Sequence, residues 1–156
     1  MKQGLDTNVL VYAHIASFAE HTSVRRFLLA RLNHPGLTIA LTPAVLHEFV
    51  HIVTDPRRFA PPLEMAEALA LARGYLDRSN VSLLATDAAA TRRALAMMEE
   101  FRLGRKRLAD TLFAATLIEN GVHELITCNG DDYRIFDELG SIDPLAKTPT
   151  APARRQ

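Results

Sequence analysis

This sequence lacks the features that would assign it to a membrane or to the cell exterior. Cys128 is its only cysteine, which excludes a disulfide within the chain. No apolar run approaches the roughly 20 residues that cross a bilayer, and the opening residues carry no apolar secretion signal. We therefore expect a cytoplasmic protein that makes no membrane contact.

The chain also lacks a net charge, because 18 Lys and Arg balance 18 Asp and Glu. An overall positive charge, which would indicate a nucleic-acid partner, is absent, so any such contact must come from local basic clusters. Two clusters qualify: Arg57-Arg58 and Arg105-Lys106-Arg107. They are candidates for gripping the phosphates of RNA, although a solvated charged face is the commoner meaning of such runs.

What is present fits one α/β domain. The 156 residues are 48% hydrophobic and 23% charged, and short apolar segments alternate with amphipathic ones, which predicts βα units over a mainly parallel sheet of four to five strands. We expect a single domain over residues 1–146. Residues 147–156 offer no large apolar side chain to bury and are predicted to form a disordered tail.

The expected elements follow from these patterns and from their end signals. Thr7 and Asn8 open a first helix, and Gly121 stands in the capping position of the last one. Strands are predicted over residues 3–5, 38–41, 81–84 and 124–127, and further helices over 20–31, 43–54, 63–77, 88–101 and 108–120.

Three acids occupy the positions where such folds hold active sites. Asp6 directly follows the first predicted strand. Glu48 lies in a helix that Thr42 caps, beside the apolar stripe of that helix. Asp110 is one turn from Phe113, on the buried side of its helix, where a carboxylate needs a partner. For Glu48 or Asp110 alone, an acid stabilised by the helix dipole is an equally good interpretation.

A fourth acidic group follows the last predicted strand, in Asn129-Gly130-Asp131-Asp132. Alone it is ordinary turn chemistry. Together with Asp6 and Asp110, however, it lies near strand ends that one fold could bring together. Adjacent anions repel, and a divalent cation is the usual remedy. All-oxygen ligands favour Mg²⁺ or Mn²⁺, which can ready a water for attack on phosphorus.

With these residues in place, the chain resembles the PIN-domain ribonucleases, and among them the VapC-type toxins of bacterial toxin–antitoxin pairs. The resemblance spans about residues 5–136. It is carried by four short motifs in order: Leu-Asp-Thr-Asn-Val-Leu from Leu5, Thr42-Pro43 followed by Glu48, Leu108-Ala109-Asp110, and Thr127-x-Asn129-x-x-Asp132-Tyr133.

This resemblance implies a three-layer α/β/α fold, a Mg²⁺-dependent endoribonuclease and inhibition by a small antitoxin protein. It implies Asp6, Glu48 and Asp110 as metal-site acids and Asp132 as the fourth member, with Asp131 and Asn129 as competing choices. Thr7 and Asn8 would support Asp6. Apolar surfaces for the antitoxin or for a homodimer could come from Tyr12, Ile15 and Phe18, or from the helix over residues 63–76.

A rival motif occupies the helix of Glu48. His47-Glu48-Phe49-Val50-His51 is a literal H-E-x-x-H, which predicts a zinc metalloprotease with Glu64 or Glu67 as a further ligand. The extended form with a third His is absent, and this alternative leaves Asp6 and Asp110 unexplained.

Two other function classes fit the sequence less well. A phosphatase with Asp6 as nucleophile would need a second Asp at the position of Asn8. A binding module without catalysis would not need all the acids.

Overall fold

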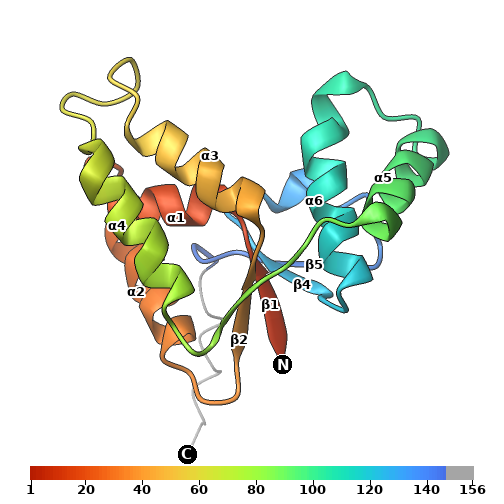
Figure 1. Ribbon diagram of the computed structural model, residues 1–156, viewed down its shortest axis with the longest axis horizontal. Coiled ribbons are helices and arrows are strands. Elements are labelled where there is room, and N and C mark those ends of the chain that lie inside the picture. Colours follow the sequence, from red (N-terminus) through yellow and green to blue (C-terminus); the bar gives the residue numbers. More distant parts are fainter. Residues whose placement is uncertain (147–156) are drawn as a thin grey trace, which may run out of the picture.

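The computed structural model describes residues 1–146, which form a five-stranded parallel sheet between two layers of helices (Figure 1). The strand order is β3-β2-β1-β4-β5. Successive strands are added on one side of β1 and then on the other, so the direction of winding reverses between β1 and β4. In open parallel sheets the crevice at such a reversal, outside the carboxyl ends of the strands, holds the ligand. The strands are β1 (Lys2–Leu5), β2 (Thr38–Leu41), β3 (Val81–Leu83), β4 (Glu124–Ile126) and β5 (Gly140–Ile142).

The helices divide into two groups. The first four lie on one side of the sheet, and α5 and α6 lie on the other (Figure 1). Their bounds are α1 (Thr7–His14), α2 (His21–Leu32), α3 (Pro43–Val53), α4 (Met65–Leu76), α5 (Ala88–Glu100) and α6 (Leu108–Glu119), with short 3-10 turns η1 (Arg105–Arg107) and η2 (Gly130–Asp132). Among these described helices there is none with the length and apolarity to cross a membrane.

Each face of the sheet has its own apolar core, as strand alternation requires. In β2, Ile39 and Leu41 face the core beneath α1 to α3, whereas Ala40 faces the core beneath α5 and α6. The central strand β1 carries one polar side chain in this setting, Gln3, which is 2% exposed. Gln3 is tolerated there because its amide donates to Glu124 Oε2 at 3.0 Å.

The predicted α/β/α fold with a parallel sheet is confirmed. All four predicted strands and all predicted helices are present, and their predicted ends lie within two residues of the observed ones. Gly121 has φ +71°, as a helix-terminating glycine should. Strand β5 was not among the predicted segments, because Gly140-Ser141-Ile142 is short and mostly polar. The predicted C-terminal tail, 147–156, lies outside the described residues.

Gly4 lets β1 approach α6 closely, which gives a first prediction. A Cβ at Gly4 would lie 2.8 and 2.9 Å from the two δ-carbons of Leu117, and because Leu117 is fully buried, its side chain can shift only by disturbing the surrounding core. We expect Gly4→Ala to lower the free energy of unfolding by about 1–3 kcal/mol, measured by urea denaturation. Adding Leu117→Val should return part of that loss. Gly74→Ala in α4 is the control, because nothing lies within 4 Å of its added Cβ. A Gly4→Ala protein as stable as the wild type would contradict this packing.

Candidate active site

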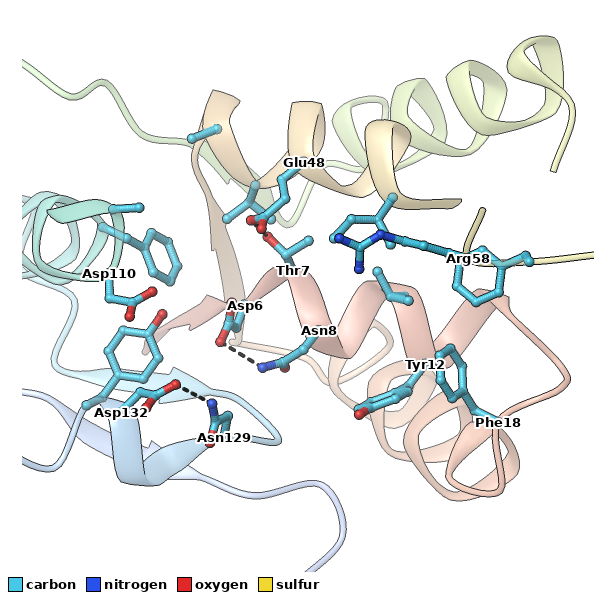
Figure 2. A pocket seen from close by; sticks show the side chains of 18 of the residues that line it. Asp6, Thr7, Asn8, Tyr12, Phe18, Glu48, Arg58, Asp110, Asn129 and Asp132 are labelled. Atoms are coloured by element: carbon cyan, nitrogen blue, oxygen red, sulfur yellow. Dashed lines mark hydrogen bonds between the residues drawn. The ribbon is translucent and has the colours of Figure 1, made fainter. Parts of the chain in front are cut away.

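A pocket of about 710 Å³ opens at the carboxyl edge of the sheet. Its floor is the junction of β1 and β4, where the Asp6 amide still donates to the Ile126 carbonyl at 3.0 Å. Four carboxylates from four separate segments line this one pocket: Asp6 after β1, Glu48 in α3, Asp110 in α6 and Asp132 in η2 (Figure 2). The fold therefore brings together the four acids that the sequence singled out.

Asp6 is held in place by side chains from both sides of the β1–β4 junction. Its backbone is extended and it stands at the N-terminus of α1. Thr127 Oγ1 and Asn8 Nδ2 both donate to Asp6 Oδ2, at 2.8 and 3.0 Å. Asn8 Oδ1 also accepts a hydrogen bond from the Cys128 amide at 3.1 Å, so Asn8 joins α1 to the loop after β4. Thr127 belongs to the last of the four sequence motifs, but its contact with Asp6 is a tertiary feature that no local pattern signals.

The electrostatic setting of Asp6 is unusual for a carboxylate. Burial, with smaller contributions from the charges of Glu48 and Asp110, raises the pKa of Asp6 to about 6, against the opposing hydrogen bond from Thr127. The pKa of Asp110 is also raised, first by burial, although the charge of Arg107 opposes this shift. The pocket thus concentrates negative charge in a partly desolvated place.

Glu48 is positioned from α3. Thr42 Oγ1 accepts a hydrogen bond from the Val45 amide at 3.4 Å and so caps this helix. The buried stripe of α3, which includes Phe49, turns the adjacent side of the helix, with Glu48, toward the pocket. There Thr7 Oγ1 donates to Glu48 Oε2 at 2.7 Å. The Thr7 side chain therefore orients Glu48, while the Thr7 backbone hydrogen-bonds to Asp6, the acid that Thr7 was predicted to support.

Arg107 is the cation that contacts these acids. Its Nη1 lies 3.3 Å from Asp132 Oδ1, and its Nε lies 3.8 Å from Asp110 Oδ2. It also donates to the Asp132 carbonyl. Asp110 is half-buried, with a side chain 35% exposed, and Arg107 is the partner that its position requires. Within residues 1–146, neither Asp6 nor Glu48 forms an ion pair.

The loop after β4 separates the three competing residues. Asn129 and Asp132 both line the pocket, and Asn129 Nδ2 donates to Asp132 Oδ2. Asp131 lies outside this pocket, is exposed and pairs with Arg134. Geometry therefore favours Asp132 over Asp131 as the acid that faces Asp6.

The other predicted basic residues are placed unevenly. Arg58 lines the pocket, while Arg57 is 85% exposed and pairs with Asp55 at 3.2 Å. Arg105 and Lys106 are exposed and are not among the pocket residues. Arg107, which was expected to face a nucleic acid, turns instead toward the acids.

The H-E-x-x-H motif does not form a zinc site in the part of the chain that the structure describes. His47 and His51 are both exposed and neither lines the pocket, and Glu48 is bonded to Thr7. No three His, Cys, Asp or Glu side chains of residues 1–146 lie close enough together to hold a metal ion directly. The metalloprotease alternative is therefore not supported, and the carboxylates themselves stand around the pocket rather than at one point.

Two apolar surfaces were suggested for partners. Ile15 is 7% exposed and belongs to the core, so its assignment to a partner surface was wrong. Tyr12 and Phe18 are half-buried and line the pocket instead. On α4, Met65, Leu69 and Leu76 are exposed, at 52%, 38% and 45%.

Comparison with known proteins agrees with this arrangement. The family model described as PIN domain matches residues 5–139. Ribonuclease VapC33 of Mycobacterium tuberculosis is 32% identical over 141 residues, which cover 90% of this chain and 96% of that protein.

Among solved structures, that of VapC20 of Mycobacterium tuberculosis, a toxin that cleaves the sarcin-ricin loop, superposes with a TM-score of 0.66. It is 16% identical, and the match covers 86% of this chain and 95% of VapC20. A toxin-antitoxin complex from Klebsiella pneumoniae gives a TM-score of 0.59 at 20% identity, covering 91% and 97% of the two chains. Because these sequence identities are low, the two comparisons show a shared fold and nothing more.

Proposed function

Because the chain belongs to the PIN-domain family and, within it, to the VapC ribonucleases, we propose that it is an endoribonuclease and the toxin of a toxin–antitoxin pair. The observation that carries this proposal is the convergence of Asp6, Glu48, Asp110 and Asp132 on one pocket at the reversal point of the sheet. Four acids from four segments are more than a helix terminus or a turn would need. The reaction we propose is hydrolysis of an RNA phosphodiester bond.

The donor set of the pocket fits a divalent cation. Four carboxylates with Arg107 as their nearby cation leave a surplus of negative charge, and all of their donor atoms are oxygen, as Mg²⁺ or Mn²⁺ prefers. We propose that Asp6, Glu48 and Asp110 hold Mg²⁺, with Asp132 and Asn129 beside them. Since Mg²⁺ keeps several waters, some of these groups would act through water. Bound there, such an ion supplies the charge that lowers the pKa of a water for attack on phosphorus.

The residues around the acids would hold the carboxylates of the pocket in fixed positions. Thr127 and Asn8 fix one oxygen of Asp6, and Thr7 fixes Oε2 of Glu48. These contacts leave the carboxylates preorganised, so little reorganisation is needed when charge develops in the transition state. Arg107 would hold Asp132 at the edge of the pocket.

RNA binding would use the exposed cations around the pocket. We propose Arg58 as the primary phosphate contact because it lines the pocket, with Arg57, Arg105 and Lys106 as more distant contributors. Arg107 is assigned to the acids rather than to RNA, since its guanidinium is paired with Asp132 and Asp110.

A small antitoxin is the partner that family membership suggests, and a solved neighbour of the same fold is a toxin-antitoxin complex. A homodimer is also proposed. The exposed apolar side chains of α4, namely Met65, Leu69 and Leu76, are a surface that either partner could cover.

The test is cleavage of purified total RNA by the partner-free protein with Mg²⁺, Mn²⁺, Zn²⁺ or EDTA. We expect discrete fragments with Mg²⁺ or Mn²⁺ and none in EDTA, because without the divalent cation no group lowers the pKa of a water for attack on phosphorus. His47→Ala is the control: it alters the exposed side of α3 and should leave cleavage unchanged. Folded protein that cuts no RNA with any metal, or that loses bound zinc and casein hydrolysis on His47→Ala, would refute the nuclease.

A further inference from the structure

The pocket has a second end whose chemistry differs from that of the acids. Tyr12 in α1, Phe18 after α1 and Phe59 after α3 all line it, and all three are half-buried. The Tyr12 and Phe18 ring centroids are 4.7 Å apart with planes at 85°, and those of Phe18 and Phe59 are 5.8 Å apart at 83°. In Figure 2, Tyr12 and Phe18 lie on the opposite side of Asn8 from Asp110 and Asp132.

A cation stands with these rings. Arg58 lines the same pocket, and its side chain is 58% exposed. Its Nε lies 3.6 Å from Asp55 Oδ2, and Asp55 also pairs with Arg57 at 3.2 Å. Asp55 thus holds Arg58 in place while sharing its charge between two arginines. Much of the Arg58 guanidinium therefore remains available to an anion in the pocket.

We infer that Tyr12, Phe18 and Phe59 form a stacking subsite for one unpaired base of the RNA, with Arg58 on the adjoining phosphate. The inference rests on the proposed nuclease function and deepens it. A strand with one phosphate at the acids must place a neighbouring nucleotide along the same pocket. Aromatic side chains take bases by stacking without sequence preference. A base inside a duplex is already stacked, so this subsite selects single-stranded or looped RNA.

The size and the mixture of groups in the pocket favour a nucleotide. A volume of about 710 Å³ suits a small organic ligand. The wall combines flat apolar rings, a cation at Arg58 and the acids at Asp6 and Glu48. A nucleotide has the matching parts, namely a flat base and an anionic phosphate. An apolar protein segment would match the rings alone and would leave Arg58 and the acids without a complement.

The experiment measures binding of fluorescein-labelled 12-residue probes by anisotropy in EDTA, with a gel to check that each probe stays intact. One probe is single-stranded RNA of random sequence, and the other is an abasic chain of the same length. Tyr12→Leu and Phe18→Leu should each weaken RNA binding by about tenfold, because a stacked base is lost. Both variants should leave the affinity for the abasic chain unchanged, because that chain has no base to stack.

Two further variants separate stacking from folding. Phe27→Leu is the matched control: its ring is also half-buried and packs against the same core, with the Arg31 guanidinium 4.8 Å from its centroid, but it lies outside the pocket. We expect RNA affinity to be unchanged there. Phe18→Tyr keeps an aromatic ring and should retain RNA binding where Phe18→Leu loses it.

The outcomes distinguish the subsite from the nuclease. Equal losses for RNA and for the abasic chain, or folded variants that bind RNA as the wild type does, overturn the subsite while the nuclease proposal stands. Variants that keep RNA affinity but no longer retain a copurifying protein partner would show that the rings bind that partner. This result would overturn the subsite as well. A wild-type protein that binds neither probe and cuts no RNA refutes both proposals.

Discussion

Asp6→Asn should reduce RNA cleavage by about a thousandfold or more and at the same time make the metal-free protein more stable at pH 8. Both side-chain hydrogen bonds to Asp6 end on Oδ2, so the amide oxygen of Asn can accept both from Thr127 and Asn8. The fold at the β1–β4 junction is therefore preserved. What the variant removes is a charge, and that charge is useful for holding a cation but costly to bury.

The expected gain in stability depends on pH in a defined direction. The pKa of Asp6 is raised to about 6 in the folded protein, against roughly 3.9 in an unfolded chain. Between these values the folded state binds more protons than the unfolded state, so stability falls as the pH rises through this window. Above pH 6 the full penalty, about 3 kcal/mol, is present. Asp6→Asn should recover up to that amount at pH 8 and almost nothing at pH 4.

The measurement is urea denaturation in EDTA at pH 4 and pH 8, with RNA cleavage assayed on the same preparations. Asp87→Asn is the matched control. Asp87 also stands at a helix N-terminus, where its side chain accepts a hydrogen bond from the Ala90 amide at 2.9 Å, but it is exposed and does not line the pocket. Asn caps a helix as well as Asp does, so neither property should change. Full cleavage by Asp6→Asn, or a stability equal to that of the wild type at pH 8, would contradict this account of Asp6.

Much of this arrangement could be predicted from the sequence because the relevant signals are local. An Asp placed directly after a strand and before a helix must emerge at the carboxyl edge of a parallel sheet, which is where Asp6 lies. Glu48 follows in the same way from the Thr42 cap and the apolar stripe of α3. Such features need only a few consecutive residues, so the chain itself carries them.

What could not be predicted depends on contacts between distant segments. Arg107 belongs to a basic run, and no local pattern distinguishes an arginine that faces solvent from one that pairs with Asp132, 25 positions away. In the sequence, Gln3 is a polar residue within a short strand, and its hydrogen-bond partner, Glu124, is 121 positions away. Strand β5 exists only because β4 offers it an edge to pair with, since its own three residues have little apolar content.

The second large effect concerns the loop after β4, where the sequence favoured Asp132 and left Asp131 and Asn129 as competing choices. Asp132→Asn should lower RNA cleavage by about 10- to 100-fold and raise the Mg²⁺ concentration needed for half-maximal cleavage. The reason is twofold. Asp132 contributes one of the four charges in the pocket, and its Oδ1 lies 3.3 Å from Arg107 Nη1. Without that partner, Arg107 is left to the charge of Asp110 alone.

Asp131→Asn is the matched control, one residue away and with the same chemical change. Asp131 pairs with Arg134, but both side chains are highly exposed, at 78% and 81%. An exposed pair of this kind contributes little to stability, and Asp131 lies outside the pocket of Asp6. Both the cleavage rate and its Mg²⁺ dependence should therefore match those of the wild type. If Asp131→Asn were the damaging change and Asp132→Asn the silent one, the acid that completes the site would be Asp131, and Arg107 would be bonded to a residue without a part in cleavage.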